Sequence, residues 1–219
     1  TSLHHIPTGE AWCDADIQKR KTEIEGENHQ KSPLYWHVVE SVNVHDDIKV
    51  AAPGHETYIK NYCETLKALG RNGIRTVCYN FMPLIDWTRT DLAMSLPSGA
   101  EALGFDADKF AAFDLFILER DNASEDYSDD ELIRAEQVFS NLSHEEKGAL
   151  TDTILAGLPG GTTGAHNVGS FKTALARYQA VSDEVLRENL VRFLEQVIPT
   201  AEAAGVRLAI HPDDPPRPM

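Results

Sequence analysis

The last apolar run of the chain ends at a histidine. Residues 206–210 are Val-Arg-Leu-Ala-Ile, and His211 follows, with Pro212, two aspartates and two more prolines directly after it. Such a run predicts a short buried strand, and the prolines prevent it from continuing. Ligands of parallel α/β folds bind at the carboxyl ends of the strands. The feature therefore predicts a parallel sheet that delivers an imidazole and carboxylates to a binding edge.

Apolar strand patterns alternate with helical patterns along the chain. We expect strands over 1–3, 34–42, 74–81 and 206–210, and helices over 14–25 (with Asp14 as N-cap), 56–69 and 182–204. This alternation implies parallel pairing with right-handed crossovers. We therefore predict an α/β fold, a parallel (β/α)8 TIM barrel. Residues 1–219 would be an incomplete barrel domain with four strands, about the first half. No GxGxxG follows an early strand, which argues against a dinucleotide-binding sheet.

A long excursion separates the third and fourth expected strands. Residues 82–182 contain helical patterns over 106–118, 128–141, 143–156 and 170–179. Ser143 with Glu146 fits a capping box. Because a structureless loop of this length is rare in a compact domain, we expect a helical insertion or lid after the third strand. The glycine-rich residues 157–169 are expected to be a hinge or mobile loop, and residues 26–33 a polar loop.

Composition excludes several classes of function. The formal net charge is −15, so we expect neither nucleic acid nor an anionic membrane as a partner. The three cysteines are widely spaced, which is typical of reduced thiols. No stretch has the roughly 20 apolar residues of a membrane span, and no basic-then-apolar leader is present. We therefore expect a cytoplasmic location. Because the chain starts at Thr1 in what resembles a strand end, we also expect it to be truncated at both ends.

His211 is the main candidate metal ligand. Imidazole and carboxylate together suit a divalent ion such as Mn²⁺, Fe²⁺ or Zn²⁺, and Asp213 or Asp214 is a candidate to contact metal or substrate. The alternative for His211 is a half-buried histidine that bonds a backbone carbonyl. The two aspartates are alternatively turn residues, because Asp before Pro commonly starts a turn.

Other strand-end residues are candidates for substrate binding. His5 follows the first expected strand, although the His4–His5 pair is alternatively just solvated. Glu40 interrupts an apolar strand, so it is either a site residue or the partner of a buried Arg or Lys. Asn80 ends the third strand, where it is suited to bond a sugar hydroxyl or serves as a turn amide.

Trp87 and Arg89 lie in the loop that follows the third strand. An aromatic ring with a guanidinium suits an acid sugar that carries a carboxylate. The alternative is a surface loop with its own ion pair. Cys78, inside the third strand, is interpreted as a small core residue rather than a nucleophile, because no base stands beside it in the sequence.

Two long motifs resemble one family. Residues 77–83 (Val-Cys-Tyr-Asn-Phe-Met-Pro) with 86–90 (Asp-Trp-Thr-Arg-Thr), and residues 209–218 (Ala-Ile-His-Pro-Asp-Asp-Pro-Pro-Arg-Pro), closely resemble mannonate dehydratase. Shorter similar segments are 3–7, 39–42 and 154–160, so the resemblance covers essentially the whole chain. Residues 26–33 look longer than the family's usual link, but they form a loop away from the expected site.

The resemblance implies a fold and a reaction. It implies a (β/α)8 barrel of the xylose-isomerase-like group, a lyase that dehydrates D-mannonate to 2-keto-3-deoxy-D-gluconate in glucuronate catabolism, and Mn²⁺ or Fe²⁺ as cofactor. It implies that His211 is a metal ligand on the fourth strand. The family's other ligands (a Cys, a second His and an Asp) and its acid/base residues come from later strands that this chain lacks. We therefore expect the 219-residue chain alone to be inactive, and the whole protein to be a homo-oligomer.

Two alternatives remain open at this stage. One is a related metal-dependent sugar isomerase or epimerase on the same barrel, which would yield a product without loss of water. The other is a non-catalytic half-barrel that serves as an interaction module. A continuation of the chain with Cys, His and Asp at strand ends would exclude the second.

Overall fold

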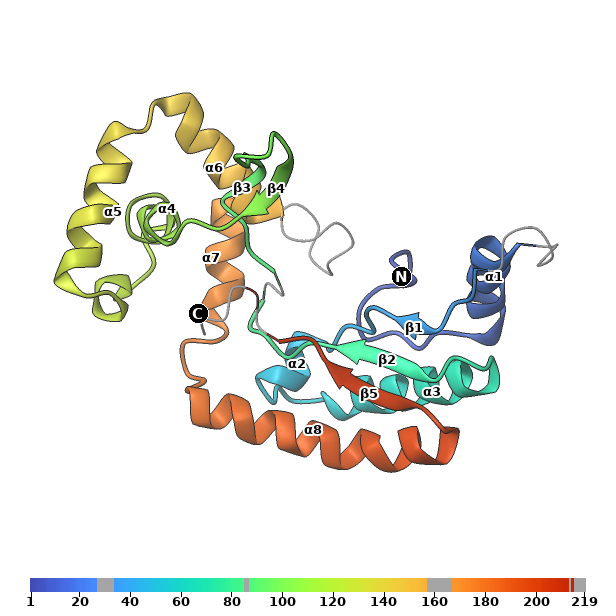
Figure 1. The fold of residues 1–219 in the computed structure, drawn as a ribbon. Helices are drawn as coiled ribbons and strands as arrows, with labels where there is room; N and C mark the ends of the chain where they lie inside the picture. The colour runs from blue at the N-terminus through green and yellow to red at the C-terminus, as the bar shows by residue number, and fades with distance from the viewer. Residues whose placement is uncertain (27–33, 85–86, 157–166, 213, 215–219) are drawn as a thin grey trace. The chain divides into compact units, whose positions relative to one another are not determined.

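The computed structural model describes residues 1–26, 34–84, 87–156, 167–212 and 214. The chain divides into two compact units. The sheet unit consists of Thr1–Leu84 with Arg177–Met219, and the helical unit consists of Ile85–Ala176. Figure 1 shows the elements of each unit.

A parallel three-stranded sheet forms the centre of the sheet unit (Figure 1). β2 (Thr76–Tyr79) lies in the middle, with β1 (Val38–Val39) on one side and β5 (Arg207–Ile210) on the other. The register places Val39 beside Val77. Because the three strands run in one direction, their carboxyl ends meet at the same edge of the sheet.

Two helices pack on one face of this sheet, α3 (Glu56–Arg71) and α8 (Asp183–Ala204). The core cluster joins buried residues of both helices to the strands, among them Leu66, Leu69, Phe193, Val197, Val39 and Val77. Phe193 of α8 meets the ring of Tyr62 edge-on, with 5.1 Å between centroids. Burying a side chain of this size contributes about 1.5–3 kcal/mol, so this layer fixes the sheet to the helices.

The ends of α8 are where the sequence predicts them. Ser182 is the N-cap, and its hydroxyl accepts a hydrogen bond from the backbone N–H of Val185 (3.3 Å). At the other end Gly205 adopts a φ of 65°. Because a left-handed residue at this position suits glycine, the chain turns directly from α8 into β5. The predicted helix over residues 182–204 and the predicted strand that follows it are confirmed.

Helix α1 (Asp14–Glu25) spans the predicted residues, but its N-cap lies one residue earlier than predicted. Cys13, not Asp14, is the N-cap. The carboxylate of Asp14 instead accepts hydrogen bonds from Arg71 (2.7 Å) and Asn72 (2.7 Å) at the end of α3. The prediction of Asp14 as a cap was wrong because its carboxylate bonds Arg71 and Asn72, which no local sequence pattern reveals.

The expected first strand, residues 1–3, is not a strand in the structure. One backbone hydrogen bond, from Glu40 N–H to the Thr1 carbonyl (3.1 Å), joins this segment to the end of β1. The expected strand over 34–42 contracts to Val38–Val39, and Leu34 and Tyr35 are exposed. Composition predicts strand propensity but cannot show whether a ladder partner is present. Within the described residues the parallel sheet therefore has three strands, where four were expected.

The helical unit contains four α-helices, two short turns of other helix types and a hairpin in its described residues. In chain order they are β3 (Asp91–Ser95), β4 (Glu101–Gly104), α4 (Ala107–Phe113), the π-helical turn η1 (Asp114–Leu118), the 3-10 turn η2 (Ala123–Asp126), α5 (Asp129–Asn141), α6 (His144–Ala156) and α7 (Val168–Ala176). Small buried residues (Ala111, Ala112, Ala135) let α4 and α5 approach closely. The capping box is confirmed: Ser143 N–H donates to Glu146, and Glu146 N–H donates back to the Ser143 hydroxyl.

The antiparallel β3–β4 hairpin was not predicted. Its turn is closed by hydrogen bonds between Leu96 N–H and the Ala100 carbonyl (2.8 Å) and between Gly99 N–H and the Leu96 carbonyl (2.9 Å). Gly99 has a φ of 81°. The Pro-Ser-Gly run between two short apolar stretches is the turn signal that predicts such a hairpin.

Two predicted features lie mostly outside the described residues, namely the polar loop 26–33 and the glycine-rich segment 157–169. Of the helices in the described parts of the chain, none is both long and apolar enough to cross a bilayer.

Candidate functional site

Polar side chains follow all three strands at the carboxyl edge of the parallel sheet. Glu40 comes directly after β1, Asn80 directly after β2, and His211 directly after β5. The backbone N–H of His211 donates to the Tyr79 carbonyl at 2.7 Å, which extends the β2–β5 ladder as far as the histidine. The fold therefore brings to one edge predicted site residues that are far apart in the sequence.

Glu40 and Cys78 project from the sheet face opposite α3 and α8. Side chains alternate between the two faces along a strand, and Val39 and Val77 are both fully buried against the helices. The next residue on each strand therefore points the other way. His211 meets Glu40 on this side of the sheet, where its Nε2 lies 3.9 Å from Glu40 Oε1.

The two ring nitrogens of His211 have different partners. Nδ1 lies 2.8 Å from the Pro212 carbonyl oxygen, and Nε2 faces the Glu40 carboxylate. The side chains are partly accessible, with 35% of His211 and 52% of Glu40 exposed. The alternative that a backbone carbonyl holds the histidine is thus correct for one nitrogen only.

Cys78 also contacts Glu40. Burial raises the pKa of the Cys78 thiol, and the nearby Glu40 charge and a hydrogen bond to that carboxylate raise it further. A thiol held in its protonated form is a poor nucleophile. This agrees with the interpretation that Cys78 is not a nucleophile. No sequence pattern predicts its contact with Glu40, although both residues stand one position after a buried valine.

The other sheet-unit candidates occupy varied surroundings. Asn80 is buried at the end of β2. His5 is more than half exposed and lies beside α1, where its Nε2 is 3.6 Å from Asp16 Oδ1, in keeping with the solvated alternative. Asp214 is partly buried. Asp213 lies outside the described residues.

Trp87 and Arg89 contact each other within the helical unit. The guanidinium carbon of Arg89 lies 4.5 Å from the Trp87 ring centroid, and its Nη1 donates to the Thr88 carbonyl at 2.7 Å. Trp87 is buried. The loop thus contains a cation–π pair. The pair keeps the aromatic ring and the guanidinium adjacent, as the sugar-acid hypothesis requires.

The described residues do not by themselves complete a metal centre. Among them, no group of three or more His, Cys, Asp or Glu side chains is arranged to hold an ion. His211 and Glu40 together offer one nitrogen and one carboxylate, a donor set that suits Mn²⁺, Fe²⁺ or Zn²⁺.

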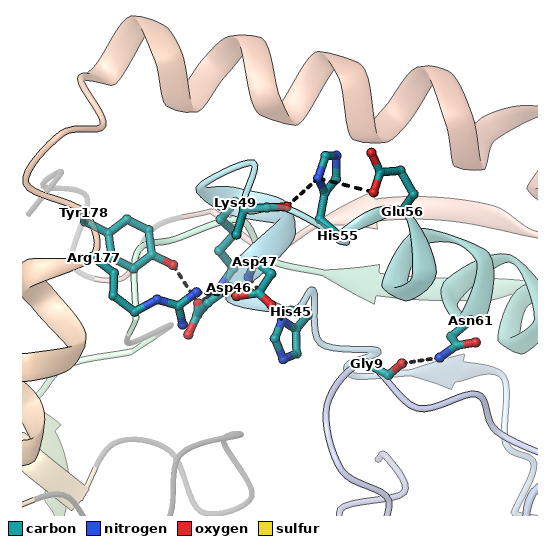
Figure 2. A network of polar contacts seen from close by, with 11 residues as sticks. Gly9, His45, Asp46, Asp47, Lys49, His55, Glu56, Asn61, Arg177 and Tyr178 are labelled. Atoms are coloured by element: carbon teal, nitrogen blue, oxygen red, sulfur yellow. Dashed lines mark hydrogen bonds and ion pairs between the residues drawn. The ribbon is translucent and has the colours of Figure 1, made fainter.

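A second polar cluster in the sheet unit surrounds the short helix α2 (Asp46–Lys49), which was not predicted (Figure 2). We call it the α2 clasp. Asp46 accepts a hydrogen bond from the Tyr178 hydroxyl (2.6 Å) and pairs with Lys49 (3.2 Å). Asp47 pairs with Arg177. The Leu84 backbone N–H also bonds the Tyr178 hydroxyl. The clasp therefore fastens the points where the chain leaves and re-enters the sheet unit.

His45 has a structural role in the clasp. Its Nδ1 accepts a hydrogen bond from the Asp47 N–H (3.1 Å), which caps α2, and its ring stacks on Tyr58 with 3.8 Å between centroids. Burial lowers the pKa of His45, although the charges of Asp47 and Asp46 act in the opposite direction. A neutral ring is what an accepting Nδ1 requires. The polar signal His-Asp-Asp at residues 45–47 was available, but a four-residue helix leaves no periodicity to detect.

The fold and this edge define a class of protein: an α/β protein whose parallel strands deliver imidazole and carboxylate groups to a common binding edge. The family model described as D-mannonate dehydratase (UxuA) matches residues 1–219. The chain therefore belongs to the D-mannonate dehydratase family.

Individual relatives agree with this assignment. The chain is 49% identical over 219 residues to a mannonate dehydratase of Marinomonas sp. (strain MWYL1) and 50% identical to one of Chromohalobacter salexigens. In both comparisons all of this chain and 54% of the relative are covered. The chain thus spans about half the length of these relatives.

A solved structure is also similar. The crystal structure of mannonate dehydratase from Streptococcus suis serotype 2 matches with a TM-score of 0.65 at 32% identity. The match covers 99% of this chain and 45% of that structure. The likeness supports the α/β fold with a parallel sheet; the four-stranded half-barrel remains a prediction.

Proposed function

We propose that this chain forms part of a metal-dependent lyase that dehydrates D-mannonate to 2-keto-3-deoxy-D-gluconate, in hexuronate (glucuronate) catabolism. The observation that carries the proposal is the family match over all 219 residues. The relatives named as mannonate dehydratases are about twice as long as this chain. The activity is therefore proposed for an enzyme of that length and not for residues 1–219 alone.

We propose His211 as a ligand of Mn²⁺ or Fe²⁺. Its Nε2 faces a carboxylate and not a backbone group, and its place at the end of β5 is where parallel α/β proteins bind ligands. Catalytic metal sites normally have at least three protein ligands. The further ligands, and the acid and base of the reaction, are proposed to come from the part of the relatives that this chain does not cover.

The reaction explains the need for an ion. Loss of the C2 proton places negative charge beside the substrate carboxylate, and the C3 hydroxyl must leave. A bound divalent ion offsets that charge. The residues of this chain would position the pieces: His211 is oriented through its Nδ1 bond to the Pro212 carbonyl, as ligand histidines usually are.

Asn80 and the Trp87–Arg89 pair are proposed substrate contacts, for hydroxyl and carboxylate groups of the sugar acid respectively. Further proposed contacts of the substrate are His5, Glu40, Asp213 and Asp214. We further propose that the complete enzyme is a (β/α)8 barrel, that residues 82–182 act as a lid, and that the protein is a cytoplasmic homo-oligomer. Size-exclusion chromatography with light scattering tests the last point.

A hybrid enzyme tests the proposed activity. In it, this chain replaces the matching segment of the Chromohalobacter salexigens relative, so that the uncovered part is supplied. With Mn²⁺ and D-mannonate, the hybrid is expected to release a 2-keto-3-deoxy acid, whereas the 219-residue chain alone is expected to be inactive. A product without loss of water would favour an isomerase or epimerase. Turnover by the isolated chain comparable to that of an intact relative would contradict the proposal that the active site needs residues from the part of the relatives that this chain does not cover.

A further inference from the structure

One hydroxyl joins the chain segments that follow two neighbouring strands. After β1 the chain runs from Glu40 to α2, whose first residue is Asp46, and after β2 it runs from Asn80 to Leu84. The Tyr178 hydroxyl donates to Asp46 Oδ1 at 2.6 Å (Figure 2), and its oxygen accepts a hydrogen bond from the Leu84 backbone N–H. All of these residues belong to the sheet unit. The hydroxyl therefore fixes the far ends of the two segments to each other.

Each of these segments begins with a proposed substrate contact. Glu40 and Asn80 directly follow β1 and β2, which are adjacent and parallel, so both residues lie at the carboxyl edge of the sheet. A binding side chain keeps its direction only if the structure that supports it is itself held in place. The directions of Glu40 and Asn80 therefore depend on the segments that Tyr178 joins.

The Asp46 side of this bridge is anchored to the helical layer. Asp46 pairs with Lys49 of the same helix at 3.2 Å, and the Lys49 carbonyl accepts a hydrogen bond from the buried Asn189 of α8 at 2.8 Å. Because α8 packs on the sheet, Asp46 is a fixed acceptor. Burial raises the pKa of Tyr178, so the hydroxyl keeps the proton that it donates to Asp46.

The Leu84 side of the bridge is strained. Leu84 has a φ of 57°, in the left-handed region that residues other than glycine rarely adopt. Such a conformation persists only when the surrounding contacts hold it. Leu84 is buried, and its N–H is bonded by Tyr178. Loss of the hydroxyl would therefore let the backbone relax at Leu84, and with it the short segment that leads back to Asn80.

We propose that Tyr178 is a positioning residue for the sugar acid: it holds residues 80–84 against α2 and thereby sets the direction in which Asn80 meets the substrate. The inference rests on the proposed function and adds to it a residue that acts through Leu84, without touching substrate or metal. Because the proposed metal ligand His211 follows a different strand, β5, we expect Tyr178 to affect the affinity for D-mannonate and not the affinity for Mn²⁺.

The test compares two tyrosines in the hybrid enzyme. Tyr178→Phe removes the bridging hydroxyl and keeps the ring. It is expected to raise KM for D-mannonate about 5-fold, the cost of one neutral hydrogen bond, while kcat and Mn²⁺ affinity stay within twofold of the unmodified hybrid. Such a pattern indicates lost substrate binding.

Tyr127→Phe is the matched control. The Tyr127 hydroxyl also bonds a carboxylate, Asp114 Oδ2 at 2.9 Å, but this pair lies within the helical unit. The control is expected to lower the midpoint of urea unfolding, as Tyr178→Phe does, and to keep the KM of the unmodified hybrid. The comparison therefore separates a positioning role from a merely structural one.

Amide hydrogen exchange, followed by mass spectrometry, adds a measurement that does not depend on activity. Peptides that contain residues 80–84 are expected to exchange faster in Tyr178→Phe than in the unmodified hybrid, because the Leu84 N–H loses its acceptor and the segment opens more readily. The same peptides are expected to be unchanged in Tyr127→Phe.

The outcomes separate this inference from the proposed function. If Tyr178→Phe lowers the urea midpoint but leaves KM within twofold, Tyr178 has only a structural role, and the inference is overturned while the proposed function stands. An equal rise of KM in both variants also overturns it. If the unmodified hybrid releases no 2-keto-3-deoxy acid, the proposed function fails, and unchanged exchange of residues 80–84 in Tyr178→Phe then overturns the inference as well.

Discussion

The α2 clasp and the carboxyl edge of the sheet contain the same kinds of side chain, but these side chains have different roles. In the clasp, each carboxylate has a donor: Asp46 contacts Lys49 and Tyr178, and Asp47 contacts Arg177. The lone pair of His45 is used by a backbone N–H. A network whose members are satisfied rigidifies a fold.

At the sheet edge, Nε2 of His211 and the carboxylate of Glu40 instead face each other across 3.9 Å. Residue identity does not distinguish the two regions, since both combine histidine with acidic side chains. The difference lies in the partners: the clasp carboxylates contact cationic or hydroxyl donors, whereas Glu40 faces His211 across a distance longer than a hydrogen bond. Mutations in the clasp should therefore change stability and leave Mn²⁺ affinity unaltered, and mutations at the edge should do the reverse.

The largest stability effect is expected from Asp46→Ala in the hybrid enzyme. This change leaves the Lys49 ammonium, only 7% exposed, without its counterion, and it removes the acceptor of the Tyr178 hydroxyl. Breaking a buried pair costs about 3–5 kcal/mol, and the partial exposure of Asp46 places the expected loss near the lower end. Urea unfolding measures it.

The double variant Asp46→Ala, Lys49→Met is the control, because it leaves no unpaired buried charge and is expected to recover part of the loss. If Asp46→Ala lowers Mn²⁺ affinity without lowering stability, the contrast between the two regions is wrong.

A smaller effect is expected from Tyr178→Phe. The ring remains, but the hydroxyl contacts to Asp46 (2.6 Å) and to the Leu84 backbone are lost. A hydrogen bond to a charged group contributes about 1.5–3 kcal/mol, so the midpoint of urea unfolding should fall by less than for Asp46→Ala. An unchanged midpoint would mean that the clasp does not fasten the two points where the chain leaves and re-enters the sheet unit.

The smallest effect on stability is expected from a change of pH. Burial lowers the pKa of His45 in the folded protein, and the charges of Arg177 and Lys49 also lower it. The negative charges of Asp47 and Asp46 act in the opposite direction. The unfolded chain then binds the proton more readily, so the stabilisation is fully present above the ordinary histidine pKa of about 6.5 and declines below it.

His45→Asn keeps a capping side chain but does not titrate. The decrease in melting temperature between about pH 7.5 and pH 5.5 should therefore be smaller for this variant than for the unmodified hybrid. Equal decreases would show that His45 does not contribute to the pH dependence.

Much of the sheet unit was predictable because its signals are local. The apolar face of α3, the Ser182 and Gly205 boundaries of α8 and the strand before His211 each depend on neighbouring residues, and the structure contains them all. The missing first strand and the short β1 depend on ladder partners that no local pattern encodes. The β3–β4 hairpin and α2 were missed because both are too short to show a clear period.

The sequence predicts which residues belong to the candidate site, but it does not predict how they contact one another. Strand-end position identified His211 and Asn80, and the interruption of an apolar run identified Glu40. The contact between His211 and Glu40 follows from the register between β1, β2 and β5. Which ring nitrogen of His211 is free depends on the turn at Pro212. Neither fact is available from residue spacing, and both decide how His211 is oriented at the edge of the sheet.

Mn²⁺ titration of the hybrid enzyme and its His211→Ala variant tests the central claim most directly. The account predicts that the hybrid binds Mn²⁺ and that the variant binds it at least about 100-fold more weakly, since a lost ligand should cost more than a lost supporting group, while its urea midpoint stays close to that of the hybrid. Equal Mn²⁺ affinity in the two proteins would contradict it.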